Sequence, residues 1–317
     1  KENGRPRRKR NSVLKMMERI EMIVTLKNER FELDVNTRGA EINRFIRRET
    51  GHDIIWRGDS SVWKFHAPIL FPHCGKIKDA FVLIDGKSFP LKSNGFARDL
   101  DHKLISHTED SAVFELSENE YTLKLFPYKF ILRVEYKLKN DGVVFRSTVT
   151  NTDSVPFKFS LGSHSAFVID NVNDFQIEFE KKEPLVQVAC YKNGFLASTS
   201  KGDCPVKKLY SEKNPGIIPV GISGFGNGHL FTDIKSDWAG LRNTRTGELI
   251  RVNTKDYPCV MIWQNPGAPE FVCIEPWFGL PDADSTDHLW EHKPGLEILE
   301  PKKTFISDQS ITVDLLN

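Results

Sequence analysis

The chain has 317 residues, with 44 Lys or Arg against 43 Asp or Glu, so its formal net charge is +1 at pH 7. A balance this close to neutral gives no global electrostatic argument for nucleic acid, a membrane surface or a polyanionic partner. The length is sufficient for one large β domain or two ordinary domains, and the 22 Phe residues can fill a sizeable core.

The cysteine content indicates reduced thiols. The number of cysteines is odd, and no Cys-x-x-Cys pair occurs. This pattern predicts a cytoplasmic protein without a disulfide framework or a zinc site. No apolar run is long enough to span a bilayer. The five cysteines are Cys74, Cys190, Cys204, Cys259 and Cys273.

The first 21 residues differ from the rest of the chain. Residues 1–11 are rich in Arg and Lys, and a short helix-like piece follows at 12–21. The segment lacks the long apolar core of a secretory signal. We interpret residues 1–21 as a basic leader outside the fold, with one domain covering residues 22–317. The alternative is a basic arm that contacts an anionic partner.

The first half of the domain reads as short strands separated by turn residues. Residues 130–138 alternate apolar with mostly charged side chains, which is typical of a half-buried antiparallel strand. Asp85-Gly86 lies between two strand-like runs and predicts a tight hairpin. The expected strands are residues 23–27, 30–35, 81–84, 87–91, 112–116, 121–126, 130–138 and 143–150.

The second half continues in the same way, and no long amphipathic helix follows residue 22. No internal repeat or low-complexity linker divides the chain. Many short strands with frequent turns predict an all-β fold of the sandwich type. The expected strands here are residues 157–161, 175–179, 185–188, 238–241, 249–252, 260–263, 271–275 and 311–315.

The run Phe271-Val-Cys-Ile-Glu-Pro-Trp-Phe-Gly places a carboxylate, Glu275, within an apolar strand. Burying an unpaired charge is costly, so its presence requires a reason. Pro276 cannot donate a ladder hydrogen bond, and we therefore expect the strand to stop near Glu275. A carboxylate beside flat rings suits a general base that faces a sugar, and it equally suits a structural ion pair.

Three further segments could carry chemistry. In Gly162-Ser-His-Ser-Ala-Phe, His164 follows a strand among small residues, and a histidine can act as a general acid near neutral pH. A lone histidine of this kind can also be structural. The other two segments, 63–76 and 93–99, are glycine-containing loops with polar flanks, and each is a weak signal alone. His288 and His292 have i, i+4 spacing but no third ligand of matching spacing, so we expect no metal there.

Together the four segments resemble the aldose 1-epimerase (galactose mutarotase-like) family. The order is that of the family: Ala-Pro-Ile-Leu-Phe-Pro at 67–72, Gly-Phe-Ala-Arg at 95–98, Gly-Ser-His-Ser-Ala-Phe at 162–167 and Cys-Ile-Glu-Pro-Trp at 273–277. The resemblance runs from about Met22 to the C-terminus. It implies a large twisted antiparallel β-sandwich, which agrees with the expected strands.

The resemblance implies that Glu275 is the general base and His164 the general acid of sugar mutarotation. Glu275 would take the proton of the anomeric hydroxyl, and His164 would protonate the ring oxygen. Reclosure from the other face would give the other anomer. No metal or organic cofactor is needed, because no electrons or groups leave the sugar. Trp277 or Phe278 could stack on an apolar sugar face.

The chain departs from the family pattern at three substrate-binding positions. Asn94 stands where the family usually has His, and Asn can hydrogen-bond but cannot titrate. Lys76 stands where Arg is usual, and lysine keeps the charge without the fork geometry. Asn227 aligns with a substrate-binding Asp, although the nearby Asp233 leaves the alignment open. His73 is a hypothetical replacement for the imidazole missing at position 94; the alternative is a loop residue without contact.

These observations leave three functions open. The leading one is an isomerase that interconverts the anomers of a free aldose, with a small-molecule sugar as its partner. The second is mutarotation of a hexose 6-phosphate. The third is a non-catalytic carbohydrate-binding protein, which the substitutions favour and the retained Glu275 and His164 oppose. Monomer and homodimer are both compatible with the sequence.

Overall fold

Two large antiparallel sheets dominate the molecule. The computed structural model describes residues 22–190, 193–197, 207–210, 215–220, 228–265 and 267–314. The basic leader of residues 1–21, the substrate-binding candidate Asn227 and the expected strand end at 315 lie outside these ranges.

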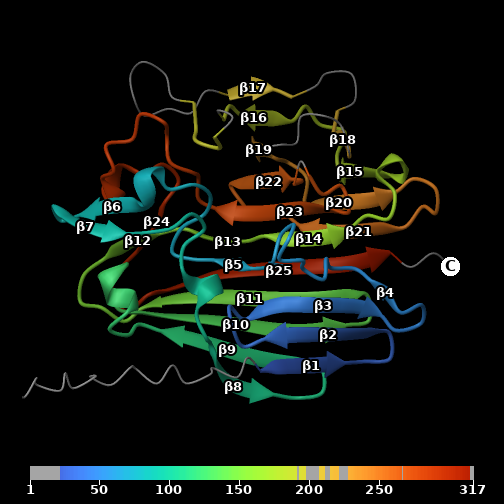
Figure 1. Ribbon diagram of the computed structural model, residues 1–317, viewed down its shortest axis with the longest axis horizontal. Helices are drawn as coiled ribbons and strands as arrows, with labels where there is room; N and C mark the ends of the chain where they lie inside the picture. Colours follow the sequence, from blue (N-terminus) through green and yellow to red (C-terminus); the bar gives the residue numbers. More distant parts are fainter. Residues whose placement is uncertain are drawn as a thin grey trace, which may run out of the picture.

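The first large sheet has nine strands. They are β8 (Lys103–His107), β9 (Ser111–Ser117), β10 (Phe130–Lys139), β11 (Gly142–Asn151), β15 (Phe175–Phe179), β18 (Ile217–Pro219), β20 (Trp238–Asn243), β21 (Leu249–Asn253) and β25 (Thr304–Asp314). Their spatial order is β18-β15-β20-β21-β25-β11-β10-β9-β8. The C-terminal strand β25 therefore lies in the middle of the sheet, paired with β11 and β21 (Figure 1).

The second large sheet carries the candidate catalytic residues. Its strands are β5 (Ile69–Leu70), β13 (Leu161–Ser163), β14 (Ser165–Val168), β16 (Val186–Val188), β17 (Lys207–Leu209), β19 (His229–Thr232), β22 (Cys259–Trp263) and β23 (Phe271–Phe278). The order is β17-β16-β19-β22-β23-β13-β5, and β14 also pairs with β23. Strand β23 is thus central, with β22 on one side and β13 and β14 on the other.

Smaller elements complete the fold. One sheet contains β1 (Ile23–Lys27), β2 (Phe31–Asn36), β3 (Glu41–Arg47) and β4 (His52–Asp53). Two further sheets have two strands each: the hairpin of β6 (Phe81–Ile84) and β7 (Lys87–Pro90), and the pairing of β12 (Phe157–Phe159) with β24 (Glu297–Leu299), which lies far along the chain. Short 3-10 turns are η1 (Lys78–Ala80), η2 (Ala97–Asp99), η3 (Thr122–Lys124), η4 (Val172–Asp174) and η6 (Trp290–His292). Within the described ranges, no helix has the length and apolar character to cross a membrane.

One hydrophobic core joins the two large sheets. Ile177 and Leu241 of the nine-stranded sheet belong to the same buried cluster as Ile262 and Ile274 of the eight-stranded sheet. Burying one such side chain contributes about 1.5–3 kcal/mol. The N-terminal strands β1–β3 lie beside β9–β11 although they are far apart in sequence (Figure 1), and the Tyr136 hydroxyl donates to the Ala40 carbonyl at 2.6 Å. The predicted all-β antiparallel sandwich is confirmed.

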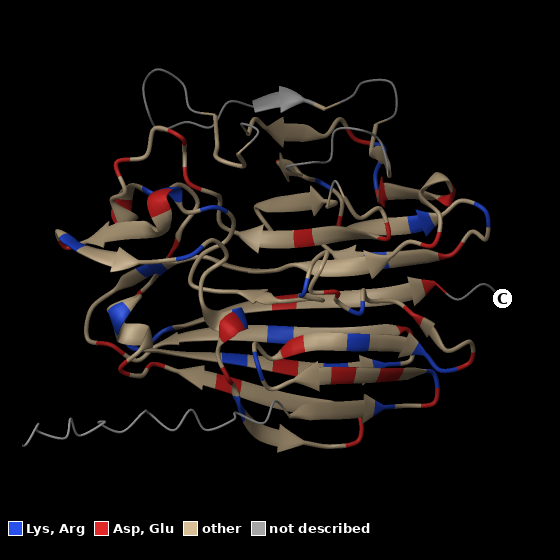
Figure 2. Cartoon of the chain, in the orientation of Figure 1, with Lys and Arg blue, Asp and Glu red and all other residues tan. Residues whose placement is uncertain are grey.

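Charged side chains occupy the exposed face of the nine-stranded sheet without a single dominant sign. Acidic and basic positions are interspersed along the lower strands of Figure 2, which belong to β8–β11 of this sheet and to β1–β3 of the four-stranded sheet. Arg133 lies opposite Glu115, and Arg146 lies opposite Asp308, each pair with a shortest N–O distance of 2.6 Å. Cross-strand pairs of opposite charge stabilise a sheet face, which agrees with the balanced composition.

The predicted hairpin at Asp85-Gly86 is confirmed. Both residues have positive φ, 49° and 70°, and they join β6 to β7. Glycine adopts such a conformation without steric cost, and Asp tolerates it better than most residues.

The predicted strand at 121–126 is wrong, because the segment forms the 3-10 turn η3. The side chain of Asn119 accepts hydrogen bonds from the backbone N–H groups of Tyr121 and Thr122, at 2.9 and 3.0 Å. The Thr122 hydroxyl in turn accepts from the N–H of Asn119 at 2.8 Å. Such local side-chain bonds compete with a strand ladder, and here they replace it.

The predicted strand end at Glu275 is also wrong, because β23 continues to Phe278. On one side the ladder to β22 runs on, with Val260 opposite Pro276. On the other side β14 pairs with residues 271–274 and β13 with residues 277–278, so the ladder is interrupted at Glu275 and Pro276. A proline without an N–H is tolerated where a ladder is interrupted.

Candidate active site

Glu275 lies in the middle of β23, on the face opposite the core. Side chains alternate along a strand, so Val272 and Ile274 enter the core while Cys273 and Glu275 face the other way. The Glu275 side chain is 1% exposed. Among the described residues, neither of its carboxylate oxygens has an aligned hydrogen-bond partner. A buried carboxyl group left so poorly paired is costly to the fold, which points to a functional role.

His164 faces Glu275 from the adjacent strands. It occupies the junction between β13 and β14, and its Nε2 lies 3.3 Å from Oε2 of Glu275. The contact lacks the alignment of a hydrogen bond, and Nδ1 has no partner among the described residues. The ring packs against Trp63 with centroids 4.9 Å apart and meets the Trp263 ring edge-to-face at 5.5 Å. Two indoles therefore hold the imidazole in place.

Burial shifts the pKa values of Glu275 and His164 in opposite directions. It raises the pKa of Glu275 well above its ordinary value, against the opposing field of Arg98. It lowers the pKa of His164 to about 3, and the positive charge of Arg98 adds to that effect. At pH values between the lowered pKa of His164 and the raised pKa of Glu275, the two side chains share one proton. Without bound sugar, these pKa directions place that proton on Glu275.

Arg98 supplies the positive charge beside the pair. It belongs to η2, and its Nη2 donates to the Ser93 carbonyl at 3.1 Å. The guanidinium lies over the Phe65 ring, 4.4 Å from the centroid, an arrangement typical of a cation–π contact. Its Nε is buried without a partner among the described residues. Arg98 ends the Gly-Phe-Ala-Arg motif at 95–98, and its place in the cavity wall was not predicted from the sequence.

A reciprocal contact joins Asn94 to Gly75, the residue before Lys76. The Gly75 N–H donates to Oδ1 of Asn94 at 2.7 Å, and the Asn94 N–H donates to the Gly75 carbonyl at 2.9 Å. Asn94 has a φ of 66°, a left-handed conformation that asparagine adopts more readily than histidine or most other residues. The asparagine thus has a local backbone role as well as a place in the cavity wall.

His73 does not line the cavity. Its side chain is fully buried behind the loop. Nε2 lies 3.2 Å from the Lys76 carbonyl, so this nitrogen carries the proton and donates it. The ring also meets Trp290 edge-on at 6.3 Å. The structure therefore gives no support to His73 as a direct substrate contact, and places it where it supports the backbone of Lys76.

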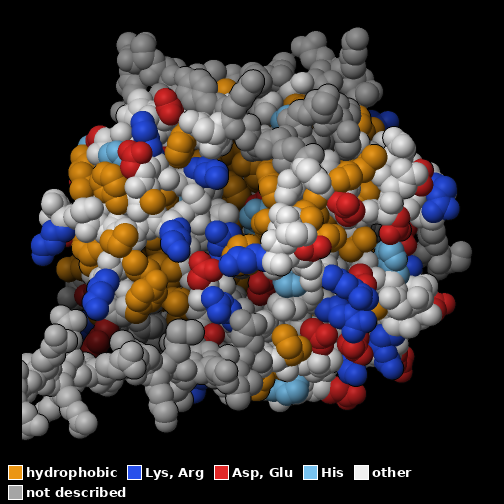
Figure 3. Space-filling view, viewed as in Figure 1, with side chains coloured by type: hydrophobic (Ala, Val, Ile, Leu, Met, Phe, Trp, Pro, Cys, Tyr) orange, Lys and Arg blue, Asp and Glu red, His pale blue; other side chains and the backbone are white. Residues whose placement is uncertain are grey.

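The residues at the open side of the pair form a cavity of about 440 Å³, within the range of small-molecule sites. Figure 3 shows a hollow near β22 and β23, bordered by hydrophobic, basic and histidine side chains. Five of the predicted site residues line this cavity: Lys76, Asn94, His164, Glu275 and Trp277. The other lining residues were not predicted as site residues. The lining residues are Trp63, Phe65, Gly75, Lys76, Ser93, Asn94, Arg98, His164, Gly194, Met261, Trp263, Asn265, Glu275, Trp277 and Pro281.

Three partly exposed aromatic residues line the cavity: Trp63, Phe65 and Trp263. They present more ring surface to the cavity than Trp277, from which stacking on the sugar was expected. Trp277 is only 3% exposed, and its indole N–H donates to the Ser163 carbonyl at 3.3 Å. Trp63, Phe65 and Trp263 are less buried and surround His164 and Arg98. The density of aromatic residues at 63–65 was the available signal for this wall.

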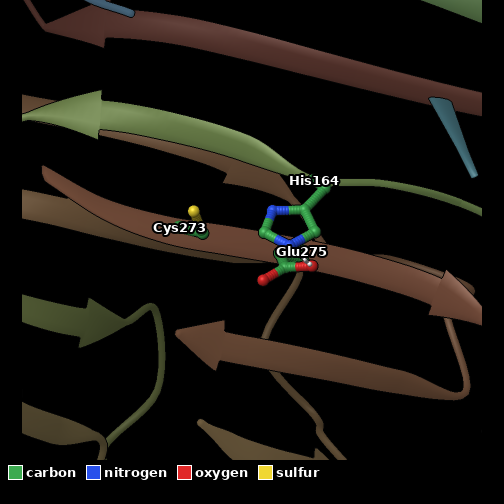
Figure 4. A group of neighbouring side chains, drawn as sticks. All are labelled: His164, Cys273 and Glu275. Carbon is green, nitrogen blue, oxygen red and sulfur yellow. Dashed lines mark ion pairs between the residues drawn. The ribbon is translucent and has the colours of Figure 1, made fainter. Parts of the chain in front are cut away.

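Potential metal ligands occur at one place in the described part of the chain. Donor atoms of His164, Cys273 and Glu275 all lie within 4.8 Å of one another, and the three side chains are buried (Figure 4). His288 and His292 do not form a cluster: His288 contacts Asp79 at 3.3 Å, and His292 contacts Asp287 at 2.7 Å. His292 ends the 3-10 turn η6, and each of the two histidines pairs with its own carboxylate.

The sequence is similar to that of known proteins over nearly its full length. The family model described as aldose 1-epimerase matches residues 22–312. The protein LacX of Lactococcus lactis subsp. lactis, in its plasmid and chromosomal forms, is 26% identical over 308 residues, which cover 93% of this chain and 100% of LacX.

Solved structures share the fold over nearly the full length. A galactose mutarotase related enzyme from Lactobacillus acidophilus is 28% identical, with a TM-score of 0.84 over 93% of this chain and 98% of that one. A galactose mutarotase-like protein from Lactobacillus casei is 25% identical, with a TM-score of 0.81 over 92% of this chain and 100% of that one. The architecture is therefore that of galactose mutarotase-like proteins.

Proposed function

The chain belongs to the aldose 1-epimerase family, and we propose that it interconverts the α and β anomers of a free aldose by opening and reclosing the sugar ring. The observation that carries the proposal is the contact of 3.3 Å between His164 and Glu275 at the base of the cavity. An acid and a base placed together can exchange protons with two neighbouring sugar oxygens. A protein that only binds sugar needs no such pair.

Ring opening requires one proton to leave the sugar and another to arrive. In the proposed step, the Glu275 carboxylate takes the proton of the anomeric hydroxyl, and the anomeric oxygen becomes a carbonyl oxygen. The bond between the anomeric carbon and the ring oxygen breaks with its electron pair on the ring oxygen. Protonated His164 delivers its proton to that oxygen. Rotation about the adjacent carbon–carbon bond and reversal of the step yield the other anomer.

The proton count of the pair stays at one throughout this cycle. Before ring opening, Glu275 is ionised and His164 is protonated; after it, Glu275 carries the proton and His164 is neutral. The second arrangement is the one that burial favours, as the pKa directions of both groups indicate. The site thus stabilises the ring-open side of the reaction. The charged arrangement is reached from the free state by proton transfer across the contact.

The remaining cavity residues are proposed to bind and orient the sugar. Trp63 and Trp263 present rings suited to the apolar face of a pyranose. Lys76, Asn94 and Arg98 supply hydrogen-bond donors for hydroxyl groups. We retain Trp277 as a wall of the cavity, and Asn227 stays a sequence-based candidate.

The test is polarimetry of freshly dissolved α-D-glucose and α-D-galactose with wild-type protein and with His164→Gln. We expect wild type to accelerate mutarotation, and the variant to be about 100-fold slower, because glutamine can hydrogen-bond to the ring oxygen but cannot donate a titratable proton. The matched control is His107→Gln on β8, whose ring is exposed and lies outside the cavity. Equal rates for wild type and His164→Gln would contradict the proposed mechanism.

The pH dependence of kcat/KM should show a broad plateau. As pH falls, activity should persist below the ordinary histidine range, because the pKa of His164 is lowered to about 3. As pH rises, activity should fall when the pair loses its proton, above the ordinary carboxyl range, because burial raises the pKa of Glu275. The profile is measured with initial rates corrected for spontaneous mutarotation. An acid limb near pH 6.5 would contradict the prediction, since it would show an ordinary histidine.

A hexose 6-phosphate is a second candidate substrate, favoured by the charges around the cavity. Among the described lining residues Glu275 is the one acid, whereas Lys76 and Arg98 are basic. Lys64 also lies over the Phe65 ring, 4.9 Å from its centroid. If the same polarimetry shows acceleration for glucose 6-phosphate and none for the free sugars, the phosphorylated substrate replaces the free aldose. Activity on none of them would favour a carbohydrate-binding protein.

We also propose the domain bounds and the partner of the protein. The family match over residues 22–312 supports the proposal of one domain that covers residues 22–317, and the leader at residues 1–21 stays a prediction from the sequence. The family match supports a small sugar as the partner. The absence of a nucleic-acid or membrane partner stays a prediction from the near-neutral charge. Cytoplasmic location, and a monomeric or homodimeric state, stay predictions from the sequence.

A further inference from the structure

We propose that the acid–base pair and Cys273 together form a binding site for a thiophilic divalent cation such as Zn²⁺, and that occupation of this site inhibits the enzyme. The binding rests on the geometry of the three side chains alone. The inhibition rests also on the proposed function, because it requires that Glu275 and His164 perform the reaction.

The strands bring the three donors to one side of the sheet. Cys273 and Glu275 are two residues apart on β23, so their side chains leave on the same face. His164 approaches this face from the junction of β13 and β14, which pair with β23 on either side of the interruption. In Figure 4 the His164 ring lies next to the Glu275 carboxylate, and the sulfur of Cys273 lies to one side of the ring. The donor atoms of the three side chains all lie within 4.8 Å of one another.

The distances suit a metal ion after a small adjustment. A tetrahedral zinc ion with bonds of about 2.0–2.3 Å holds its ligand atoms about 3.3–3.8 Å apart. The distance of 3.3 Å between Nε2 of His164 and Oε2 of Glu275 already meets this requirement. The sulfur of Cys273 must close in by no more than about 1 Å, which a side-chain rotation can provide.

The donors also have free capacity in the described structure. Neither carboxylate oxygen of Glu275 has an aligned hydrogen-bond partner among the described residues, although the nearby Trp277 side chain opposes the rise of its pKa. The Nε2 atom of His164 faces this carboxylate at 3.3 Å without the alignment of a hydrogen bond. A sulfur, a nitrogen and an oxygen are a donor set that zinc accepts, and the cavity leaves a route of entry to a fourth position. Coordination would take the lone pairs that the reaction needs, so Glu275 could not accept the proton of the anomeric hydroxyl and His164 could not carry the proton for the ring oxygen.

The experiment measures mutarotation at increasing Zn²⁺ with wild-type protein, Cys273→Ala and the control Cys190→Ala. Cys273 does not line the cavity, so its variant should keep the metal-free rate within about threefold. We expect EDTA-reversible inhibition of wild type and of the control, and a loss of about tenfold or more in zinc sensitivity for Cys273→Ala. Activation by zinc, no effect on wild type, or unchanged inhibition of Cys273→Ala would each overturn the proposal.

A second readout separates this proposal from the proposed function. Co²⁺ titration of the intact protein should give a thiolate-to-cobalt charge-transfer absorption that Cys273→Ala abolishes, whether or not a sugar is turned over. If the absorption appears while no sugar reacts, the metal site stands and the proposed function fails. If it is absent from wild type, the metal site fails. Should Cys273→Ala not fold, as judged by its thermal unfolding, Cys273→Ser replaces it, because its hydroxyl keeps an atom at the γ position but binds zinc and cobalt far more weakly than a thiolate.

Discussion

Replacement of Glu275 by glutamine should lower kcat/KM for mutarotation by about 10²–10⁴-fold, the range associated with a single positioned acid–base group. Glutamine has nearly the shape of glutamate, so the cavity and the packing of β23 should persist. The amide cannot take the proton of the anomeric hydroxyl. Polarimetry gives the rate, and sugar binding by calorimetry should change far less than the rate.

The same variant should be more stable than wild type, and increasingly so as pH rises. Burial raises the pKa of Glu275 in the folded protein, so folding takes up a proton between the ordinary carboxyl pKa and the raised one. The stability that depends on this proton is complete below the ordinary pKa and is lost as pH rises through the raised pKa. Across that window the advantage of Glu275→Gln should grow by about 1.4 kcal/mol per pH unit.

Urea unfolding at two pH values on either side of neutrality measures this difference. The matched control is Glu297→Gln on β24, a half-buried glutamate outside the cavity whose pKa burial also raises. The control should keep full activity. A Glu275→Gln variant that is inactive and also less stable than wild type would indicate a structural ion pair instead of a catalytic base that costs the fold stability.

The sequence was sufficient for the architecture because side-chain alternation reports which face of a strand is buried. Residues 130–138 and the Asp85-Gly86 turn are examples in which local pattern and tertiary structure agree. The predicted strand at 121–126 was wrong because the Asn119 side chain accepts hydrogen bonds from the backbone N–H groups of Tyr121 and Thr122, and the apolar pattern of the segment does not report such a contact. The expected strand end at Pro276 was wrong for a different reason. Whether a proline ends a strand depends on whether a neighbouring strand requires an N–H donor at its position, and this depends on the tertiary structure.

The site was only partly predictable for the same reason. Glu275 and His164 were identified from the run at 271–279 and from the family resemblance, but nothing in the sequence placed them 3.3 Å apart. Their opposite pKa directions follow from burial, which no motif encodes. Arg98 and Trp63 reach the site from distant loops, and His73 turns away from it toward the Lys76 carbonyl.

The largest expected loss of stability comes from the buried pair of Asp282 and Lys293. Their side chains are 5% and 3% exposed, and Nζ lies 2.6 Å from Oδ1. Lys293→Met should lower the free energy of unfolding by about 3–5 kcal/mol, because it leaves an uncompensated carboxylate in the interior. Urea unfolding gives the value. The double variant Asp282→Asn/Lys293→Met should recover part of the loss, since both charges are then removed.

This pair also holds the loop that carries Lys76. The N–H of Asp282 donates to the Lys76 carbonyl at 3.0 Å, and Oδ2 accepts from the N–H of Lys78 at 2.8 Å. Weakening the pair should therefore raise KM for the sugar while kcat changes little, because Glu275 and His164 are held by other strands. The control Arg146→Met removes an exposed ion pair and should alter neither stability nor KM appreciably. If Lys293→Met proved as stable as wild type with an unchanged KM, the pair would have no part in positioning Lys76, and the wall of the cavity would depend on His73 and the Gly75–Asn94 contact instead.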